Sequence, residues 1–274
     1  MQTATVSSTA LDLPAPAAQA AHPAMSRIYL LETKYEFLKL FRTPVYLIGT
    51  LGFPVMFYLL FGVAMAPKSN GQIGAAEYLL ASYCVFGTVT AALFAFGAGV
   101  AVERASGWMT LKRATPLPPS AYLGAKVLAS MTFGTIILVL MGTAAFTMGG
   151  VRFPPLVWLR LWAVLVLGCI PFCLGGLVIA FTVPPTGAPG IVNMINLPLS
   201  FASGLWFPIM MLPKFIQAVA PILPQYHVAQ LALGAIGAVD QPNTVQHLLA
   251  LLAATLVLGV IAQWAWKRSE MKAS

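Results

Sequence analysis

Charged residues are scarce in this sequence. Only 8% of its 274 residues are charged, whereas 59% are hydrophobic. A soluble domain carries about 25% charged residues. A single globular core cannot bury this much apolar surface, so the composition excludes an ordinary soluble domain and predicts an integral membrane protein.

Cysteine is scarce as well. Cys84, Cys169 and Cys173 all lie in apolar stretches, which excludes a disulfide framework. Cys169 and Cys173 would share a helix face, either as a soft-metal site or as small buried hydrophobic residues. Because no His or acidic residue lies near them in the sequence, we favour buried hydrophobic residues and expect no metal site.

Catalytic and nucleotide-binding motifs are also missing. The sequence has no H-E-x-x-H motif and no G-x-x-x-x-G-K-[ST] loop. Its apolar stretches hold almost no carboxylate or histidine, which disfavours a proton- or sodium-coupled carrier. We therefore expect no catalytic residue and no cofactor in this chain. Energy for uphill transport would come from another chain.

Six apolar stretches are long enough to cross a bilayer as helices, at about 20 residues each. The fourth and fifth are separated by the Pro- and Gly-rich segment 183–190. The predicted fold is an all-α integral membrane protein with six transmembrane helices. The predicted spans are 44–65, 78–102, 127–149, 161–182, 191–212 and 248–266.

Two further segments belong to the predicted transmembrane domain, 25–274, and a tail precedes it. Residues 1–24 are rich in Ala, Pro, Ser and Thr and are predicted to be a disordered tail. Residues 25–42 have apolar side chains at helical spacing and predict an interfacial helix, or else a charged flank of the first span. Residues 213–239 are apolar but interrupted by prolines, which predicts a re-entrant hairpin between spans five and six.

The distribution of Lys and Arg predicts the orientation. With a cytoplasmic N-terminus, eleven of these residues lie inside and four outside. This bias follows the positive-inside rule and places both termini and the loop 103–126 in the cytoplasm. The net charge of +8 is thus assigned to cytoplasmic loops. We expect no nucleic-acid partner, because no basic run is interleaved with aromatic residues.

The loop 103–126 combines charge with apolar side chains. It carries Arg104, Lys112 and Arg113, but also Trp108 and Leu111. A solvated connector needs none of these apolar residues. The loop is either an amphipathic segment facing the lipid or a docking helix for a cytoplasmic partner.

The fifth predicted span carries a polar face. Asn193, Asn196, Ser200, Ser203 and Phe207 recur at helical spacing. Polar groups in a membrane helix turn toward another helix or a cavity. This face is therefore a contact between helices, a lining of the substrate path, a dimer seam, or a combination of these.

The same loop and the segment Ser203–Gln230 resemble a known family. The residues that carry the resemblance in the loop are Glu103, Arg104, Gly107, Leu111, Thr115, Pro116 and Leu117, followed by Tyr122 and Lys126. They resemble the cytoplasmic loop of permease subunits of ABC-type exporters of the ABC-2 class. The segment Ser203–Gln230 is similar to the fifth span and outer hairpin of that family. The resemblance covers about residues 25–268.

The resemblance implies a function and partners. The loop residues from Glu103 to Leu117 would couple the permease to a cytoplasmic ABC ATP-binding subunit, present in two copies and holding the ATP and Mg²⁺. A second permease copy would complete a homodimer in the bacterial cytoplasmic (inner) membrane. The residues of the implied outer gate are Pro208, Pro213, Pro221, Pro224 and His227.

The implied activity is export of a hydrophobic or amphiphilic substrate. The uncharged fifth span, with its Asn and Ser residues, favours drug-like, antibiotic-like, lipid-linked or glycan-linked cargo over an ion. The alternative is a membrane anchor or assembly subunit that transports nothing. An ion-coupled secondary transporter is a weaker alternative.

Overall fold

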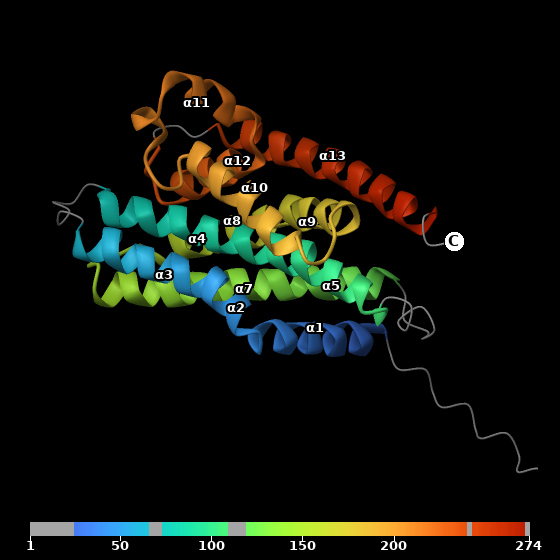
Figure 1. Cartoon of the computed structure of the whole chain (residues 1–274). Helices are drawn as coiled ribbons and strands as arrows, with labels where there is room; N and C mark the ends of the chain where they lie inside the picture. The colour runs from blue at the N-terminus through green and yellow to red at the C-terminus, as the bar shows by residue number, and fades with distance from the viewer. Residues whose placement is uncertain (1–24, 66–72, 109–118, 240–242, 272–274) are drawn as a thin grey trace, which may run out of the picture.

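The structure, a computed structural model, describes residues 25–65, 73–108, 119–239 and 243–271. Every regular element in these residues is helical, which confirms the predicted all-α class. Figure 1 shows the long helices packed side by side as one bundle, with α13 along one edge and α1 along the opposite edge. The predicted tail, residues 1–24, lies outside the described residues.

Two of the long helices change their winding along their length. The first begins after α1 (Met25–Phe41) and consists of α2 (Pro44–Leu47), η1 (Ile48–Gly52), α3 (Phe53–Phe57) and η2 (Tyr58–Ala64). The second consists of α4 (Ala75–Leu93), η3 (Phe94–Ala98) and α5 (Gly99–Ala105). The segments η1, η2 and η3 are π-helical, a form that occurs mostly as short insertions in α-helices.

The remaining helices cover the second half of the chain. They are α7 (Pro119–Thr147), α8 (Pro155–Gly168), α9 (Ile170–Thr182), α10 (Ala188–Ala202), α11 (Lys214–Val219), α12 (Pro224–Ala235) and α13 (Thr244–Met271), with the 3₁₀ turns η4 (Ile209–Met211) and η5 (Ala220–Ile222). The helix α8 ends one residue before α9 begins, and Pro171 lies in the first turn of α9. Pro171 therefore marks a break in the fourth predicted span, as expected of a residue without a backbone N–H.

Among the described residues, five helices are long and apolar enough to cross a membrane. They are Pro44–Ala64, Ala75–Ala105, Ser120–Thr147, Pro155–Thr182 and Thr244–Ser269. They lie where the first, second, third, fourth and sixth spans were predicted. The chain is therefore a multi-pass membrane protein.

The prediction of one continuous helix over 191–212 is wrong. The helix α10 has 15 residues, about 22 Å at 1.5 Å per residue, and a hydrocarbon core is about 30 Å thick. It ends because Gly204 takes a positive φ of 78°. The Leu205 N–H donates to the Ser200 carbonyl and the Gly204 N–H to the Phe201 carbonyl, which is the Schellman helix ending.

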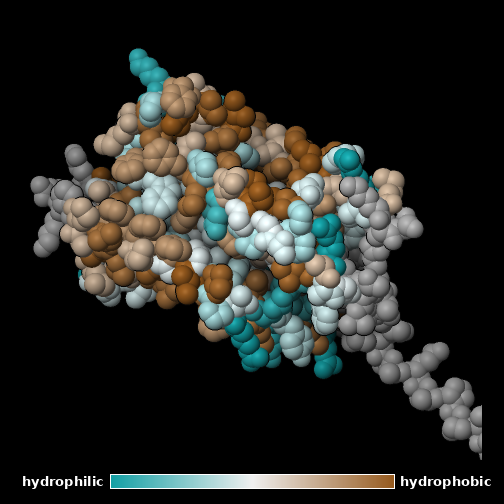
Figure 2. All heavy atoms as spheres, viewed as in Figure 1, coloured by the Kyte–Doolittle hydropathy of each residue, from teal (hydrophilic) through white to brown (hydrophobic). Residues whose placement is uncertain are grey.

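The predicted interfacial segment is helical in the structure, as α1. Tyr29 donates to Ser120, and Phe37 packs on Phe133, so α1 lies lengthwise beside the first half of α7. Figure 2 shows hydrophilic side chains gathered along α1, at the lower edge of the view, with more hydrophobic side chains over the helices above. Its placement in the membrane surface stays a prediction.

The predicted hairpin 213–239 contains two helical arms. They are α11, with 6 residues, and α12, with 12 residues, joined through η5. Pro224 is the first residue of α12, where a missing N–H costs nothing. The helix α12 packs against α4, α8 and α13, so its backbone is covered by protein. Its depth in the membrane stays a prediction.

Two glycines allow the second and fourth long helices to approach closely. A Cβ at Gly176 would lie 2.6 Å from the Phe96 Cβ and 2.9 Å from the backbone nitrogen of Gly97. Small residues are typical where membrane helices touch, because dispersion contacts between backbones replace the hydrophobic effect. The contact between α9 and η3 thus depends on the missing side chain of Gly176.

We predict that Gly176→Ala destabilises the protein, because the added methyl meets backbone that cannot move aside. Overpacking of this kind costs about 1–3 kcal/mol. The matched control is Gly175→Ala, whose Cβ would meet only two leucine methyl groups at 3.9 and 4.0 Å. The melting temperature of the purified protein should fall for Gly176→Ala and not for Gly175→Ala. Equal melting temperatures for the two variants would contradict the close contact.

Candidate functional site

Charged side chains gather at the end of the bundle that carries the loop after α5, and all of them except Lys39 are buried. Glu36 and Lys39 come from α1, Glu103 from α5, and Tyr122 and Lys126 from α7. Lys126 is fully buried, and its Nζ donates to Glu36 and, at 2.9 Å, to Glu103 Oε1. Lys39 donates to Glu103, and the Tyr122 hydroxyl donates to Glu103 Oε2. We call these five residues the charge cluster.

The charge cluster is balanced. Two carboxylates face two ammonium groups, and Lys39 Nζ also lies 3.6 Å from Glu36 Oε1. A buried ion pair adds little net stability, but removing one partner costs about 3–5 kcal/mol because a buried charge loses its compensation. Hydrogen bonds are also directional, unlike apolar contacts. The cluster therefore fixes the relative positions of α1, α5 and α7.

Arg104 connects the same end of α5 to a further helix. Its guanidinium donates to the carbonyls of Phe181 at 3.4 Å and Val183 at 3.3 Å, and lies over the Phe181 ring. These carbonyls are at the C-terminus of α9, where the last acceptors of a helix have no partner within it. A cation there also interacts favourably with the helix dipole. Arg104 thus attaches α5 to α9.

The loop begins directly after these anchors. Gly107 has a positive φ of 72° and ends the helical turn that follows α5, and Trp108 next to it is 47% exposed. The predicted coupling residues Leu111, Thr115, Pro116 and Leu117 lie outside the described residues. Of the predicted coupling residues, the structure thus places Glu103, Arg104 and Gly107 together at the start of the loop.

The side chains of Glu103 and Arg104 point into their own chain. Glu103 is only 5% exposed, and both of its oxygens are bonded within the cluster. A direct contact from Glu103 to a partner is therefore inconsistent with this geometry. In the sequence, Tyr122 and Lys126 stand out only as part of the loop motif, and Glu36 was not predicted as a site residue. The available signal for Glu36 was an acidic residue one turn before the apolar Leu40, which is also buried.

A cavity of about 560 Å³ opens beside the cluster, between α1 and α5. Glu32, Tyr35 and Trp108 line it together with members of the charge cluster. Tyr35 and Trp108 are substantially exposed, at 65% and 47%. This part of the surface thus offers aromatic rings and a carboxylate beside the loop, which suits a partner protein carrying basic and apolar side chains.

A second site lies at the opposite end of the bundle, where the hairpin is. Trp206 packs edge-on against Phe57, Tyr83 and Phe86, with ring centroids 4.9, 5.8 and 5.5 Å away. A pocket of about 600 Å³ opens there, lined by Trp206, the first two long helices and the exposed Phe207. We call it the aromatic pocket. Its walls suit an apolar or aromatic ligand.

The polar face predicted for the fifth span is divided in the structure. Asn196 donates to Thr90 at 2.8 Å, and Gln225 donates to Ser200 at 2.7 Å, all four residues being buried. These bonds join α10 to α4 and α12, so this part of the face is a contact between helices of one chain. Asn193 is exposed instead. Ser203, like Asn196, is buried.

The predicted gate prolines shape the hairpin. Pro208 precedes η4 and Pro213 precedes α11, each with an extended ψ that turns the chain into the next helix. His227 is buried, with its Nε2 2.9 Å from the Pro221 carbonyl and its Nδ1 2.8 Å from His247 Nδ1. Because the carbonyl accepts, His227 Nε2 donates. The turn at Pro221 is thus connected through His227 to α13.

The described residues contain no group of three His, Cys, Asp or Glu side chains that could hold a metal ion. Cys169 and Cys173 are buried free thiols. The Cys169 thiol lies 3.2 Å from the Val166 carbonyl, one turn earlier in α8. Their surroundings are those of small buried hydrophobic residues.

Comparison with known proteins agrees with this architecture. The family model described as ABC-2 type transporter matches residues 29–236. A protein of Bacillus subtilis (strain 168), named "Putative transport permease YvfS", is 26% identical over 196 residues, covering 70% of this chain and 78% of that protein. The match to the family model contains most of α1, the start of the loop and both arms of the hairpin. This chain belongs to the ABC-2 type transporter family, as a transport permease.

Proposed function

We propose that this chain is the transmembrane subunit of an ATP-driven exporter in the bacterial cytoplasmic membrane. The family implies association with an ABC ATP-binding subunit. In our proposal two copies of that subunit carry the ATP and Mg²⁺, and two copies of this chain form a homodimer. Both termini are cytoplasmic. A sixth crossing runs through α10 to Leu212, and the hairpin enters from the outer side.

The observation that carries this proposal is the position of the charge cluster beside the loop. Glu103 and Arg104 begin the loop and are bonded to α1, α7 and α9. A displacement of the loop by a partner would therefore reach three helices at once. This is a plausible physical basis for coupling, since a ligand on another chain can shift the balance between two arrangements of packed helices.

The partner would contact the exposed side chains, and the buried ones would transmit the movement. Trp108 and Tyr35 are accessible at the mouth of the cavity beside the cluster. Exposed aromatic residues dominate many protein interfaces. Glu103 would act as a positioning residue that holds the loop to the bundle. Affinity for the partner would thus depend on Trp108 and Tyr35, and coupling would depend on Glu103.

The aromatic pocket supports a hydrophobic or amphiphilic substrate, such as a drug-like, antibiotic-like or lipid- or glycan-linked molecule. Trp206 and Phe57 supply large apolar walls, and the Tyr78 hydroxyl, which donates to the Gly204 carbonyl at 2.7 Å, adds a polar edge. A pocket with apolar walls and few polar groups is typical of sites for small amphiphilic molecules. Phe207 of the predicted substrate path lies on its rim.

We predict that Glu103→Gln uncouples the transporter while the complex still assembles. The amide keeps the shape but weakens the bonds to Lys39 and Lys126, so movement of the loop reaches α1 and α7 less effectively. The permease would be reconstituted with the ATP-binding subunit that copurifies with it. Transport per ATP hydrolysed should fall about tenfold, which corresponds to about 1.4 kcal/mol of lost coupling.

Two variants serve as comparisons for this experiment. Lys34→Gln removes an exposed charge of α1 outside the cluster and should leave both assembly and coupling unchanged. Trp108→Ala should weaken copurification of the ATP-binding subunit instead. Wild-type coupling in Glu103→Gln, with the protein folded and assembled, would contradict the role of the cluster.

We predict that Met211→Ala lowers export of a lipophilic cation, whereas Met210→Ala does not. Met211 lines the aromatic pocket, and its neighbour Met210 does not line it although it is 87% exposed. The measurement is ATP-dependent accumulation of ethidium or a fluorescent phospholipid in inverted membrane vesicles. The substrate KM should rise about fivefold for Met211→Ala, equivalent to about 1 kcal/mol of lost apolar contact.

The vesicle experiment also tests the direction of transport. Accumulation inside inverted vesicles corresponds to export from the cell. Equal kinetics for the two Met variants would exclude the aromatic pocket as the binding site. If the wild-type complex moved neither probe although ATP was hydrolysed, the proposed substrate class would be wrong.

A further inference from the structure

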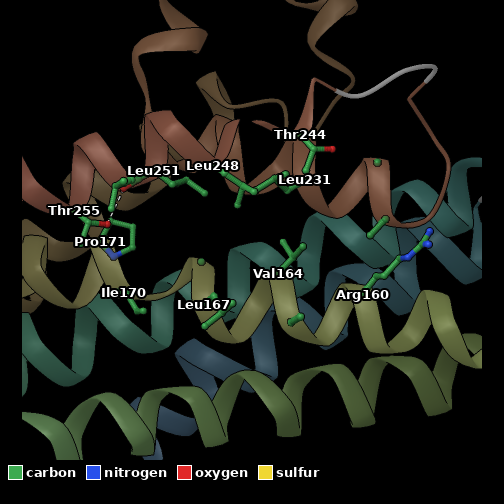
Figure 3. Close-up of a pocket in the computed structure, with 15 residues that line it drawn as sticks. Arg160, Val164, Leu167, Ile170, Pro171, Leu231, Thr244, Leu248, Leu251 and Thr255 are labelled. Atoms are coloured by element: carbon green, nitrogen blue, oxygen red, sulfur yellow. Dashed lines mark hydrogen bonds between the residues drawn. The ribbon is translucent and has the colours of Figure 1, made fainter. Parts of the chain in front are cut away.

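An apolar groove runs along the side of the bundle between α8 and α13, away from both sites above. Its volume is about 660 Å³, and residues of α12 also line it. Figure 3 shows Val164 and Leu167 of α8 facing Leu248 and Leu251 of α13, with Leu231 of α12 between the two helices. We call it the lateral groove.

The length of the lateral groove corresponds to one leaflet of a bilayer. On the fourth long helix it extends from Arg160 of α8 to Pro171 of α9, and on α13 from Thr244 to Thr255, eleven positions in each case. Eleven residues of α-helix rise by about 16 Å. The hydrocarbon core of a bilayer is about 30 Å thick, so each leaflet contributes about half of that. The groove thus begins near the hairpin end and stops near the middle of the membrane.

The interior of the groove requires a hydrocarbon rather than a polar ligand. The Thr255 hydroxyl donates to the Leu251 carbonyl at 2.7 Å, the bond drawn in Figure 3. The buried polar atoms of the described residues that lack a partner lie on Tyr58, Ser82, Ser130 and Ser203, none of which lines the groove. None of these unsatisfied buried atoms faces into the groove, and its walls are mostly aliphatic, so a polar occupant inside it would lose its hydrogen bonds.

Arg160 lies at one end of the groove, as Figure 3 shows, and this is the end that the proposed orientation places near the membrane surface. It is exposed, and no hydrogen bond or ion pair joins it to another described residue. Arg152, the other arginine at this end, lies over the Phe146 ring at 3.7 Å. A guanidinium next to an apolar groove at the membrane surface suits a phosphate, which it binds through two parallel N–H groups.

A second copy of this chain fits the groove less well than a lipid. The acidic residue described at the hairpin end is Glu77, and its carboxylate already accepts the Gly74 N–H at 2.9 Å. Glu32, Glu36 and Glu103 lie at the opposite end, in or beside the charge cluster. Among the described residues at the hairpin end, a partner copy offers Arg160 the Glu77 carboxylate, which already accepts a hydrogen bond, whereas every phospholipid brings a phosphate to the membrane surface.

We propose that the lateral groove binds one phospholipid of the leaflet at the hairpin end. One acyl chain lies between α8 and α13 against α12, and the phosphate is held by the Arg160 guanidinium. The bound lipid fills the gap that α13 leaves beside α8. This site is separate from the aromatic pocket and from the charge cluster, and it does not depend on the proposed function.

The test measures lipid binding to the purified full-length chain by native mass spectrometry. The probes are phosphatidylglycerol, phosphatidylcholine and a diacylglycerol with the same chains. We expect one tightly retained phospholipid with either phosphate headgroup and much weaker retention of the diacylglycerol. Arg160→Gln should weaken phosphatidylglycerol binding about five- to tenfold, as expected for one basic residue facing a lipid phosphate.

A groove-filling variant tests the position of the acyl chain independently. Ala163 lines the groove, so Ala163→Phe should reduce retention of the phospholipid without changing any charge. The matched controls are Arg152→Gln, which removes the other arginine, and Val139→Phe, on an exposed face of α7 outside the groove. Both controls should retain the lipid, and the melting temperatures of all variants report whether they are folded.

Several outcomes would overturn the proposal. Equal binding of diacylglycerol and phosphatidylglycerol, or no effect of Arg160→Gln in a folded protein, would show that the site does not bind the phosphate. If Ala163→Phe retained the phospholipid as well as the wild type does, the acyl chain would not lie in the groove. A disulfide between two chains of Leu252→Cys in membranes would show that a second copy occupies the groove instead.

Discussion

The ammonium group of Lys126 has no access to water, and the arrangement of one whole end of the bundle depends on how its charge is compensated. Its acceptors, Glu36 and Glu103, lie on two other helices, so α1, α5 and α7 must meet where they do. Arg104, the next residue after Glu103, extends the connection to α9. A single buried charge thus holds three helices in contact, because separating them would leave it without a compensating carboxylate, and Arg104 adds a fourth helix.

The number and position of most long helices could be predicted from the sequence, because uninterrupted apolar stretches have few other stable forms in a bilayer. The end of α10 could not be predicted from hydropathy. Residues 203–212 are apolar enough to continue the predicted span. The helix nevertheless ends before them, because Gly204 takes the left-handed conformation and local hydrogen bonds close the helix there. A glycine within an apolar stretch is compatible with both outcomes. In the structure the ended helix is accompanied by a long-range hydrogen bond from the Tyr78 hydroxyl to the Gly204 carbonyl, which local sequence does not reveal.

The candidate sites were predictable only in part, for a related reason. Spacing on a helix identifies residues that share a face, but not what that face meets. Asn193 and Asn196 are neighbours on the same face, yet Asn196 is bonded to Thr90 and Asn193 is exposed. In the same way, Glu36 and Lys126 are ninety residues apart, and nothing in the local sequence of either residue indicates the other. A family motif marked the loop as functional, and the contacts show which of its side chains face inward.

The balance of the charge cluster has an electrical consequence. Moving one elementary charge through a potential of 100 mV involves about 2.3 kcal/mol, so mobile charged elements make a membrane protein sensitive to voltage. The two glutamates and two lysines sum to zero, and a proton passed between them leaves that sum unchanged. If the four charged side chains of the cluster shift as a unit, they carry no net charge through the membrane field. The membrane potential would then act on Arg104 and the other charges at this end, and not on the cluster that holds α1, α5 and α7 together.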